Sequence, residues 1–389
     1  MIAWGDIYKV VAAMAPLYFA LGLGYGSVRW WRFFSPEQCA AINTMVVYFS
    51  MPFFTFDFVV RTDPFSMNYR VIAADAVSKV ITILAMAAWA RCCAKAGAQS
   101  WSITGFSLAA LNNTLVVGVP LLNAMYGKWA QDLVVQIAVV QSMVWFPLLL
   151  MAFELRKAWV AGAAAPSTAA DGDVDHVHLD GSDGGRGRRV EPVMSPPPEK
   201  DGSGGDVEMN AVVVAPAPAA TGGVRLRFWP TARGVGLKLA RNPNVYASVL
   251  GVVWACIAYR WNLSLPGIVT GSLQVMSKTG TGMSMFSMGL FMAQQKRMIA
   301  CGAGLTALGL ALRFVAGPIA TLVGAAALGL RGDVLHLAII QAALPQSIAS
   351  FVFAKEYGLH ADVLSTAVIF GTLISLPILI AYYVVLGFV

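Results

Sequence analysis

The chain has 389 residues, of which 58% are hydrophobic and 12% are charged. A soluble domain carries about 25% charged residues, so this composition excludes a soluble enzyme with an ordinary core and indicates a polytopic membrane protein. The net charge of +7 then reflects basic residues that flank membrane segments, and it does not indicate nucleic-acid binding.

Apolar segments of about 20 residues, the length needed to cross a bilayer, occur in two groups. We expect five spans before residue 155, at 7–28, 38–60, 71–90, 101–125 and 133–154. We expect five more after residue 240, at 244–260, 267–293, 300–329, 334–354 and 363–387. The expected organisation is a first five-helix membrane repeat at 1–155 and a second at 241–389.

The segment between the two groups, 156–240, has a different composition. It contains "AADGDVDHVHLDGSDGGRGRR" and "MSPPPEKDGSGG", and ten of the chain's twenty acidic residues lie between 171 and 208. A segment this rich in Gly, Pro and Asp cannot bury enough apolar surface to fold. We therefore expect a disordered loop between spans 5 and 6.

Lysine and arginine residues in the connections predict the orientation in the membrane. Short connections after odd-numbered spans hold seven of these residues, and those after even-numbered spans hold five. The ends of the long loop add Arg156, Lys157, Lys238 and Arg241. Because cytoplasmic loops carry the excess of positive charge, the long loop is expected in the cytoplasm and both termini on the opposite side.

Two expected spans are interrupted in matching positions. Span 4 contains "NNTLVVGVPLL" and span 9 contains "QAALPQSIASFVF", so both carry proline beside polar residues in mid-membrane. With five spans in each half, equivalent spans run in opposite directions, and broken helices in such repeats point to a transporter's substrate site. Half-helix N-termini can hold an anion without a formal cation. The alternative is a proline kink that serves only helix packing.

Ionisable residues inside expected spans form a second candidate site. Asp75 and Lys79 are four residues apart in span 3, so they share one helix face and can pair. Arg313 lies in span 8, the counterpart of span 3, where it either helps to neutralise this region or lies near the interface. Charges inside the membrane are commonly functional, and a purely structural salt bridge is the alternative.

Sequence motifs for other chemistry are missing. The five cysteines are scattered without a CxxC pair, which indicates neither a disulfide framework nor a zinc site. No GxxxxGK[ST] sequence is present, so ATP-driven transport is not indicated. No nucleophile–base or paired-acid constellation stands out, and we expect no enzyme activity, no bound metal and no cofactor.

Long motifs in both halves resemble the PIN-FORMED auxin carriers of plants. They are "DIYKVVAAMAPLYFALGLGYGSVRWWRFFSPEQCAAIN", "NTLVVGVPLLNAMYG", "RNPNVYASVLG", "MSMFSMGLFMA" and "LPQSIASFVFAKEYGLHADVLSTAVIFGTLISLPI". The resemblance covers about residues 1–157 and 225–389. It implies an all-α polytopic membrane protein whose ten transmembrane helices form two inverted five-helix repeats. Helices 4 and 9 would be broken and cross, as in bile-acid symporters and sodium/proton antiporters.

The resemblance also implies roles for individual residues. Spans 1, 2, 6 and 7 would form a scaffold that dimerises, and spans 3–5 and 8–10 a mobile transport domain. Asp75 and Lys79 match the family's support site, and Met51 and Thr55 would face the substrate from the scaffold. The other positions carried over for substrate binding are Asn113, Val117, Gly118, Pro120, Gln141, Pro345, Gln346, Ile348 and Ala349.

One motif departs from the family and one feature varies within it. The family's "LPQGIVPFVF" reads "LPQSIASFVF" here, so Ser347, Ala349 and Ser350 are expected to enlarge or polarise the pocket wall. The central loop is short, and short-loop members are mostly associated with the endoplasmic reticulum. That membrane is therefore favoured over the plasma membrane.

These features indicate a facilitative carrier for the indole-3-acetate anion, with elevator-type alternating access driven by membrane potential. The expected partners are indole-3-acetate, related aromatic carboxylates, the bilayer and a second copy of the chain. Two alternatives stay open. One is a sodium- or proton-coupled symporter of another organic anion, with Asp75 at its ion site. The other is a non-transporting receptor or scaffold whose loop recruits partners.

Overall fold

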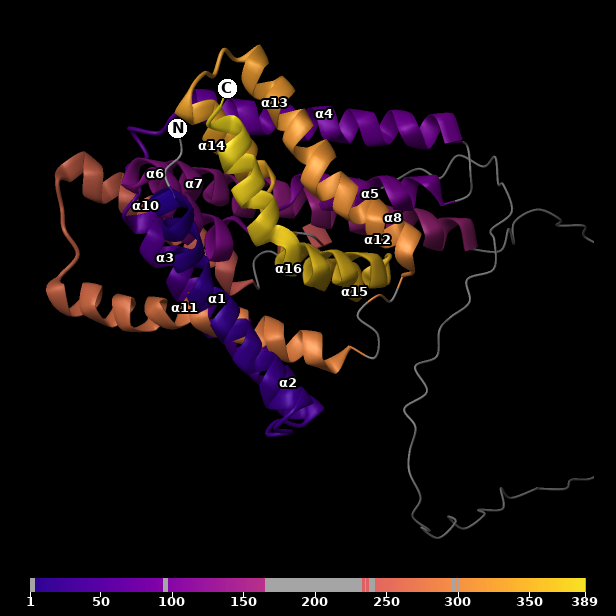
Figure 1. Cartoon of the computed structure of the whole chain (residues 1–389), viewed down its shortest axis with the longest axis horizontal. Coiled ribbons are helices and arrows are strands. Elements are labelled where there is room, and N and C mark those ends of the chain that lie inside the picture. The colour runs from indigo at the N-terminus through magenta and orange to yellow at the C-terminus, as the bar shows by residue number, and fades with distance from the viewer. Residues whose placement is uncertain are drawn as a thin grey trace, which may run out of the picture.

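The computed structural model describes residues 4–93, 97–164, 233–234, 236–237, 242–295, 299 and 301–388. Within these ranges every regular element is a helix (Figure 1). Most of the expected central loop lies outside the described residues. The helix before it continues to Ala164, past the expected boundary at 155.

Within the described residues, every apolar segment that was expected as a span is helical over most of its length, although two segments are interrupted and the helix expected at 133–154 runs from Lys128 to Ala164. The first half contains α1 (Trp4–Arg29), α2 (Pro36–Met45), η1 (Val46–Ser50), α3 (Met51–Val60), α4 (Tyr69–Cys93), α5 (Ala98–Ala110), η2 (Thr114–Gly118), α6 (Val119–Tyr126), α7 (Lys128–Val140), η3 (Gln141–Trp145) and α8 (Phe146–Ala164). The second contains α10 (Pro243–Trp261), α11 (Gly267–Gln294), α12 (Ala303–Ala311), η4 (Leu312–Ala316), α13 (Gly317–Ala327), α14 (Asp333–Ala342), α15 (Ile348–Glu356) and α16 (Ala361–Leu386).

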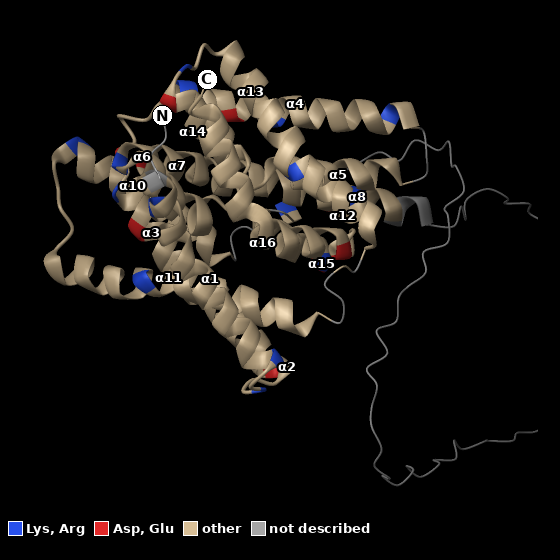
Figure 2. Ribbon diagram, in the orientation of Figure 1, with Lys and Arg blue, Asp and Glu red and all other residues tan. Residues whose placement is uncertain are grey.

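The described helices have the length and composition of a membrane protein. Six are long and apolar enough to cross a bilayer: Ile7–Arg29, Pro36–Val60, Tyr69–Cys93, Lys128–Val160, Ala303–Ala327 and Ala361–Leu386. Figure 2 shows long stretches of helix without charge, with Lys, Arg, Asp and Glu mainly toward helix ends and connections. The all-α membrane architecture expected from the sequence is confirmed at this level.

Helix packing divides the described residues into two groups that lie side by side (Figure 1). In one group α1 packs against α11, and α3 packs against both α10 and α11. In the other, α4 packs against α5 and α13, and α12 packs against α16. Helices α6 and α7 pack against α1 and α3 respectively and so connect the two groups.

Small residues allow the closest of these contacts, between α1 and α11. A Cβ atom at Gly24 would overlap the backbone carbonyl of Phe286, and one at Gly289 would overlap that of Leu21. Small residues at helix interfaces in membranes let backbones approach in this way. Gly22, two residues earlier on the same helix, has no atom within 4 Å of the position its Cβ would take.

We expect Gly24→Val to destabilise the protein and Gly22→Val to leave stability nearly unchanged. Overpacking a tight contact costs about 1–3 kcal/mol, and at Gly24 the obstacle is backbone, which cannot rotate away. Thermal unfolding of the purified proteins in one detergent compares the two variants directly. Equal unfolding temperatures for both variants would contradict the close approach of α1 and α11.

Four wide helical turns mark where prolines interrupt the regular hydrogen-bond ladder. The turns are η1, η2, η3 and η4, and each ends two residues before a proline: Pro52, Pro120, Pro147 and Pro318. Proline lacks the N–H that would bond the carbonyl four residues back, so the helix widens there instead of ending. The carbonyl left free by Pro318, that of Phe314, accepts a hydrogen bond of 2.6 Å from the Tyr382 hydroxyl.

The buried core surrounds the interrupted helices. Leu111, Val117 and Leu344 are fully buried beside the interruptions and belong to one continuous hydrophobic cluster. By contrast, Ile268 and Val275 on α11 are 86% and 68% exposed. Large apolar side chains on the outside suit a surface that contacts lipid.

Candidate functional site

Two helices are broken near the middle of the molecule. α5 ends at Ala110, and the chain leaves helical geometry at residues 111–113, which we call the first break. α14 ends at Ala342, and residues 343–347 form the second break before α15 begins. Together the two breaks form the crossover, and each places the end of one half-helix opposite the beginning of another.

The first break lies at the asparagines rather than at the proline. Pro120 lies further along the chain, inside the continuous helix formed by η2 and α6, where the wide turn η2 accommodates its missing N–H. Asn112 is not helical and forms an isolated β-bridge with Gln346. In the second break, Pro345 itself lies in the non-helical segment. The expectation of two broken helices holds, with a different breaking residue in each.

Backbone hydrogen bonds join the two breaks. Asn112 and Gln346 form an isolated antiparallel bridge. The Asn113 amide donates to the Pro345 carbonyl at 2.8 Å, and the Ser347 amide donates to the Leu111 carbonyl at 3.2 Å. Unpaired backbone groups at membrane depth cost several kcal/mol each, by order of magnitude. Each break therefore provides hydrogen-bond partners for backbone groups of the other.

Side-chain amides hold the crossover together. Asn112 Nδ2 donates to the Gln341 carbonyl at 2.5 Å, and Gln141 Nε2 donates to the Asn112 carbonyl at 2.8 Å. Gln346 Nε2 donates to the Ser107 carbonyl at 3.0 Å and to Ser350 Oγ at 2.6 Å. These bonds connect α5, η3, α14 and α15 with the two breaks and give the crossover a defined shape.

Four buried amides at the crossover keep an atom without a protein partner, those of Asn113, Gln141, Gln341 and Gln346. Asn113 Nδ2 donates no hydrogen bond to a protein atom, and Gln141 Oε1 accepts none. Asn113 is 8% exposed and is the last residue of the first break, directly before η2. Buried polar groups are normally paired, so an unpaired donor here is suited to a ligand atom. The first N–H groups of the adjoining half-helix add a partial positive charge.

Asp75 and Lys79 form the ion pair expected from their spacing. Lys79 Nζ lies 2.6 Å from Asp75 Oδ2, and the two side chains are only 4% and 10% exposed. The ammonium group also lies 5.4 Å from the centre of the Trp145 ring, a favourable cation–π distance. A small cavity of about 10 Å³ adjoins the pair and is also lined by Arg313 and Gln341.

The residues proposed for substrate binding fall into distinct environments. Val117, Gly118, Pro345 and Gln346 are buried in or beside the breaks, and Pro120, Ile348 and Ala349 are partly exposed. Met51 and Thr55 lie on α3 in the other helix group, where Met51 Sδ accepts a hydrogen bond of 3.0 Å from Ser284 Oγ. The structure thus brings most of them to the crossover and places two on the facing group.

Ser350 does not polarise a pocket wall as expected. Its hydroxyl is completely buried, accepts from Gln346 Nε2 at 2.6 Å and donates to the Ser347 carbonyl at 2.7 Å. Because both of its hydrogen bonds are internal, Ser350 fixes the Gln346 side chain. The expectation failed because the family motif says which residue is replaced but not which way its side chain points.

Sequence reasoning did not predict two residues at the crossover as site residues, and it did not locate a third. Asn112 and Gln341 are polar residues in apolar spans, a signal that was available in the sequence. Arg313 was noted as a charge in a span, but its depth could not be assigned from sequence. The structure buries it almost completely, at 1% exposure, directly against both broken helices.

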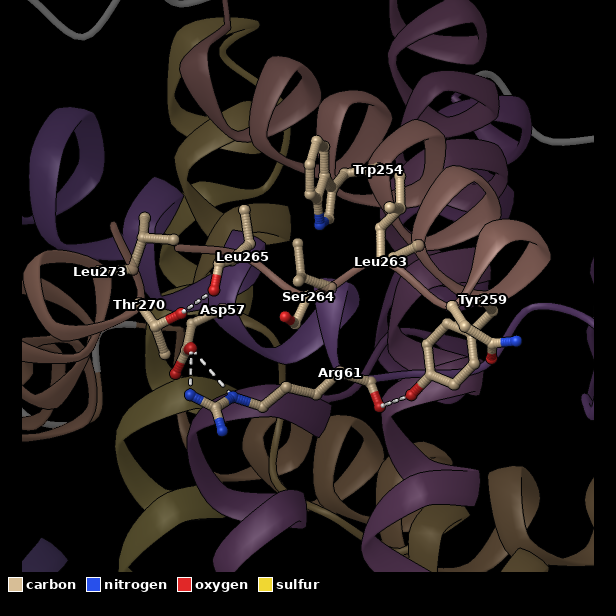
Figure 3. A pocket seen from close by; sticks show the side chains of 12 residues that line it. Asp57, Arg61, Trp254, Tyr259, Leu263, Ser264, Leu265, Thr270 and Leu273 are labelled. Carbon is tan, nitrogen blue, oxygen red and sulfur yellow. Dashed lines mark hydrogen bonds and ion pairs between the residues drawn. The ribbon is translucent and has the colours of Figure 1, made fainter. Parts of the chain in front are cut away.

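A separate hollow of about 390 Å³ lies where α3 ends and where α10 gives way to α11 (Figure 3). Its charged lining is already paired, because Arg61 lies 2.7 Å from Asp57. The Tyr259 hydroxyl donates to the Arg61 carbonyl at 2.9 Å. The hollow shares no lining residue with the breaks, so we assign the functional site to the crossover.

Comparison with known proteins places the chain among membrane carriers. The family model described as "Membrane transport protein" matches residues 9–383. The chain is 82% identical to "Probable auxin efflux carrier component 5c" of Oryza sativa subsp. japonica and 51% identical to "Auxin efflux carrier component 5" of Arabidopsis thaliana, in each case over the whole of both proteins. The chain is also 39% identical to "Auxin efflux carrier component 8" of Arabidopsis thaliana, over 99% of this chain and 100% of that relative. The chain therefore belongs to the PIN-FORMED auxin efflux carrier family of membrane transporters and is not an enzyme.

Proposed function

We propose that the protein carries the indole-3-acetate anion across a membrane as a facilitative transporter driven by membrane potential. The observation that carries the proposal is the crossover, in which the buried Nδ2 of Asn113 has no protein partner beside the start of a half-helix. The names of the relatives reported above, which are auxin efflux carrier components, support the choice of substrate.

The crossover suits a carboxylate better than a cation. The substrate carboxylate accepts a hydrogen bond from Asn113 Nδ2, and the half-helices η2 and α15 point their N-termini toward it. Each N-terminus contributes roughly half a positive charge. The indole ring then packs on apolar parts of Ile348 and Ala349, which are partly exposed, and on Met51 of the opposite helix group.

The helix packing supports two inverted repeats of five spans. Under such a repeat the contact of α1 with α11 corresponds to the contact of α10 with α3, and both are present. Likewise α4 with α5 corresponds to α13 with α14. We propose that α1, α2, α3, α10 and α11 form the scaffold and the remaining helices a transport domain that moves as an elevator.

The membrane arrangement follows from the charge distribution. We propose that the connection between α8 and α10 is cytoplasmic, that both termini face the opposite side, and that scaffolds pair in a homodimer. The short central segment favours the endoplasmic reticulum over the plasma membrane.

Reconstituted transport tests the function. Purified protein in liposomes should take up radiolabelled indole-3-acetate saturably, and an imposed potential that is positive inside should accelerate uptake of the anion. Replacing sodium by potassium at zero potential should leave the rate unchanged.

Each alternative predicts a different result in the same assay. A sodium- or proton-coupled symporter would lose uptake when the coupling gradient is removed, whatever the potential. A receptor or scaffold would bind indole-3-acetate or a partner without moving substrate. Uptake equal to that of empty liposomes, in protein that still binds substrate, would overturn the proposed transport.

A further inference from the structure

Arg313 is a buried cation beside the crossover. It hydrogen-bonds the ends of both broken helices, α5 and α14, and not the breaks themselves. It lies in the wide turn η4, between α12 and α13, and is 1% exposed. Gly317, one turn later, brings this helix close to α5, because a Cβ there would overlap the Ala109 carbonyl. The backbone around Arg313 therefore lies directly against the end of a broken helix.

The guanidinium group of Arg313 bonds the ends of both broken helices at once. Its Nη1 donates to the Leu108 carbonyl at 3.2 Å, in the last turn of α5, and its Nη2 donates to the Ala342 carbonyl at the end of α14. Carbonyls in the last turn of a helix have no partner within the helix. The fixed fork of a guanidinium can satisfy two of them, one in each helix.

Charge balance explains why this cation can remain buried. The Asp75 and Lys79 charges cancel across 2.6 Å. Among the described residues no carboxylate forms an ion pair with Arg313. Each helix C-terminus carries roughly half a negative charge, so two of them together match one guanidinium. The counter-charge of Arg313 is thus the pair of broken helices itself.

We propose that Arg313 is a positioning residue that holds the C-terminal ends of α5 and α14 together and so sets the geometry of the substrate site. Leu108 and Ala342, its two acceptors, shortly precede Asn113 and Pro345, which bond each other at 2.8 Å. A change in how Arg313 holds the helix ends therefore reaches the substrate-binding donors. The substrate part of this inference rests on the proposed function.

Hydrogen–deuterium exchange on Arg313→Lys tests the positioning role without any substrate. Lysine keeps the charge but cannot reach two carbonyls with the geometry of a fork, so amides at both breaks should exchange about tenfold faster or more. Helices α1, α3, α10 and α11 should exchange as in the unchanged protein. Arg156→Lys is the matched control, because Arg156 Nε bonds one side chain, Ser100 Oγ at 2.7 Å, away from the breaks.

Binding then tests the consequence for substrate. Arg313→Lys should raise the dissociation constant for indole-3-acetate by about tenfold, and Arg156→Lys should not. Unchanged exchange at the breaks, faster exchange at one break only, or uniformly faster exchange in all helices would overturn the positioning role. Faster exchange at both breaks with unchanged affinity would overturn its link to the substrate site. If the unchanged protein binds no indole-3-acetate, the proposed function fails, and the exchange result alone decides the role of Arg313.

Discussion

Asn113→Ala is expected to weaken the binding of indole-3-acetate by about 10- to 100-fold while the protein stays folded. A hydrogen bond to a charged group contributes about 1.5–3 kcal/mol, and about 1.4 kcal/mol is a factor of ten in affinity. Asn113 Nδ2 has no partner in the protein, so its removal breaks no internal bond of that atom. Equilibrium binding of radiolabelled substrate to purified protein, together with its unfolding temperature, measures both effects.

The neighbouring asparagine provides the matched control. Asn112 is 3% exposed, its Nδ2 donates to the Gln341 carbonyl at 2.5 Å, and its Oδ1 accepts from Thr114 Oγ1 at 3.0 Å. Asn112→Ala should therefore lower the unfolding temperature, because it leaves buried groups unpaired. Asn113→Ala should lower it much less. Normal affinity in Asn113→Ala would remove this residue from the site.

The positions of the helices could be predicted from sequence because a membrane span is a continuous run of about 20 mostly apolar residues. Segments 7–28 and 267–293 were expected, and α1 and α11 occupy nearly those ranges. The wide turns before Pro52 and Pro318 were not expected. A proline in a helix can end it, kink it or widen one turn, and the choice depends on tertiary packing, which periodicity does not contain.

The candidate site was only partly predictable for the same reason. Asp75 and Lys79 are four residues apart on one helix, so their pairing follows from helix geometry. The bonds from Gln141 to Asn112 and from Arg313 to Leu108 join residues on different helices. Such contacts depend on how the helices are oriented, which a single sequence does not determine. The family resemblance identified Gln141 as a site residue, but it did not show where in the structure Arg313 lies.

Asp75→Asn is expected to destabilise the protein more than any other single change considered. Removing one partner of a buried pair leaves an uncompensated charge and costs about 3–5 kcal/mol. The pair of Asp57 and Arg61 is the matched control, since it has the same spacing and a distance of 2.7 Å, but the Arg61 side chain is 51% exposed. Asp57→Asn should cost less than about 1 kcal/mol. Unfolding temperatures in one detergent compare the two changes.

The double variant Asp75→Asn/Lys79→Met separates support of the crossover from ion coupling. It removes both charges and keeps similar volumes, so it should recover much of the stability lost in Asp75→Asn. A proton carrier must reach water, whereas the Asp75 and Lys79 side chains are 10% and 4% exposed. We therefore expect both variants to transport indole-3-acetate more slowly, with the pH and sodium profiles of the unchanged protein. A pH or sodium dependence that is present in the unchanged protein and disappears in both variants would identify Asp75 as an ion site, and the carrier would then be an ion-coupled symporter.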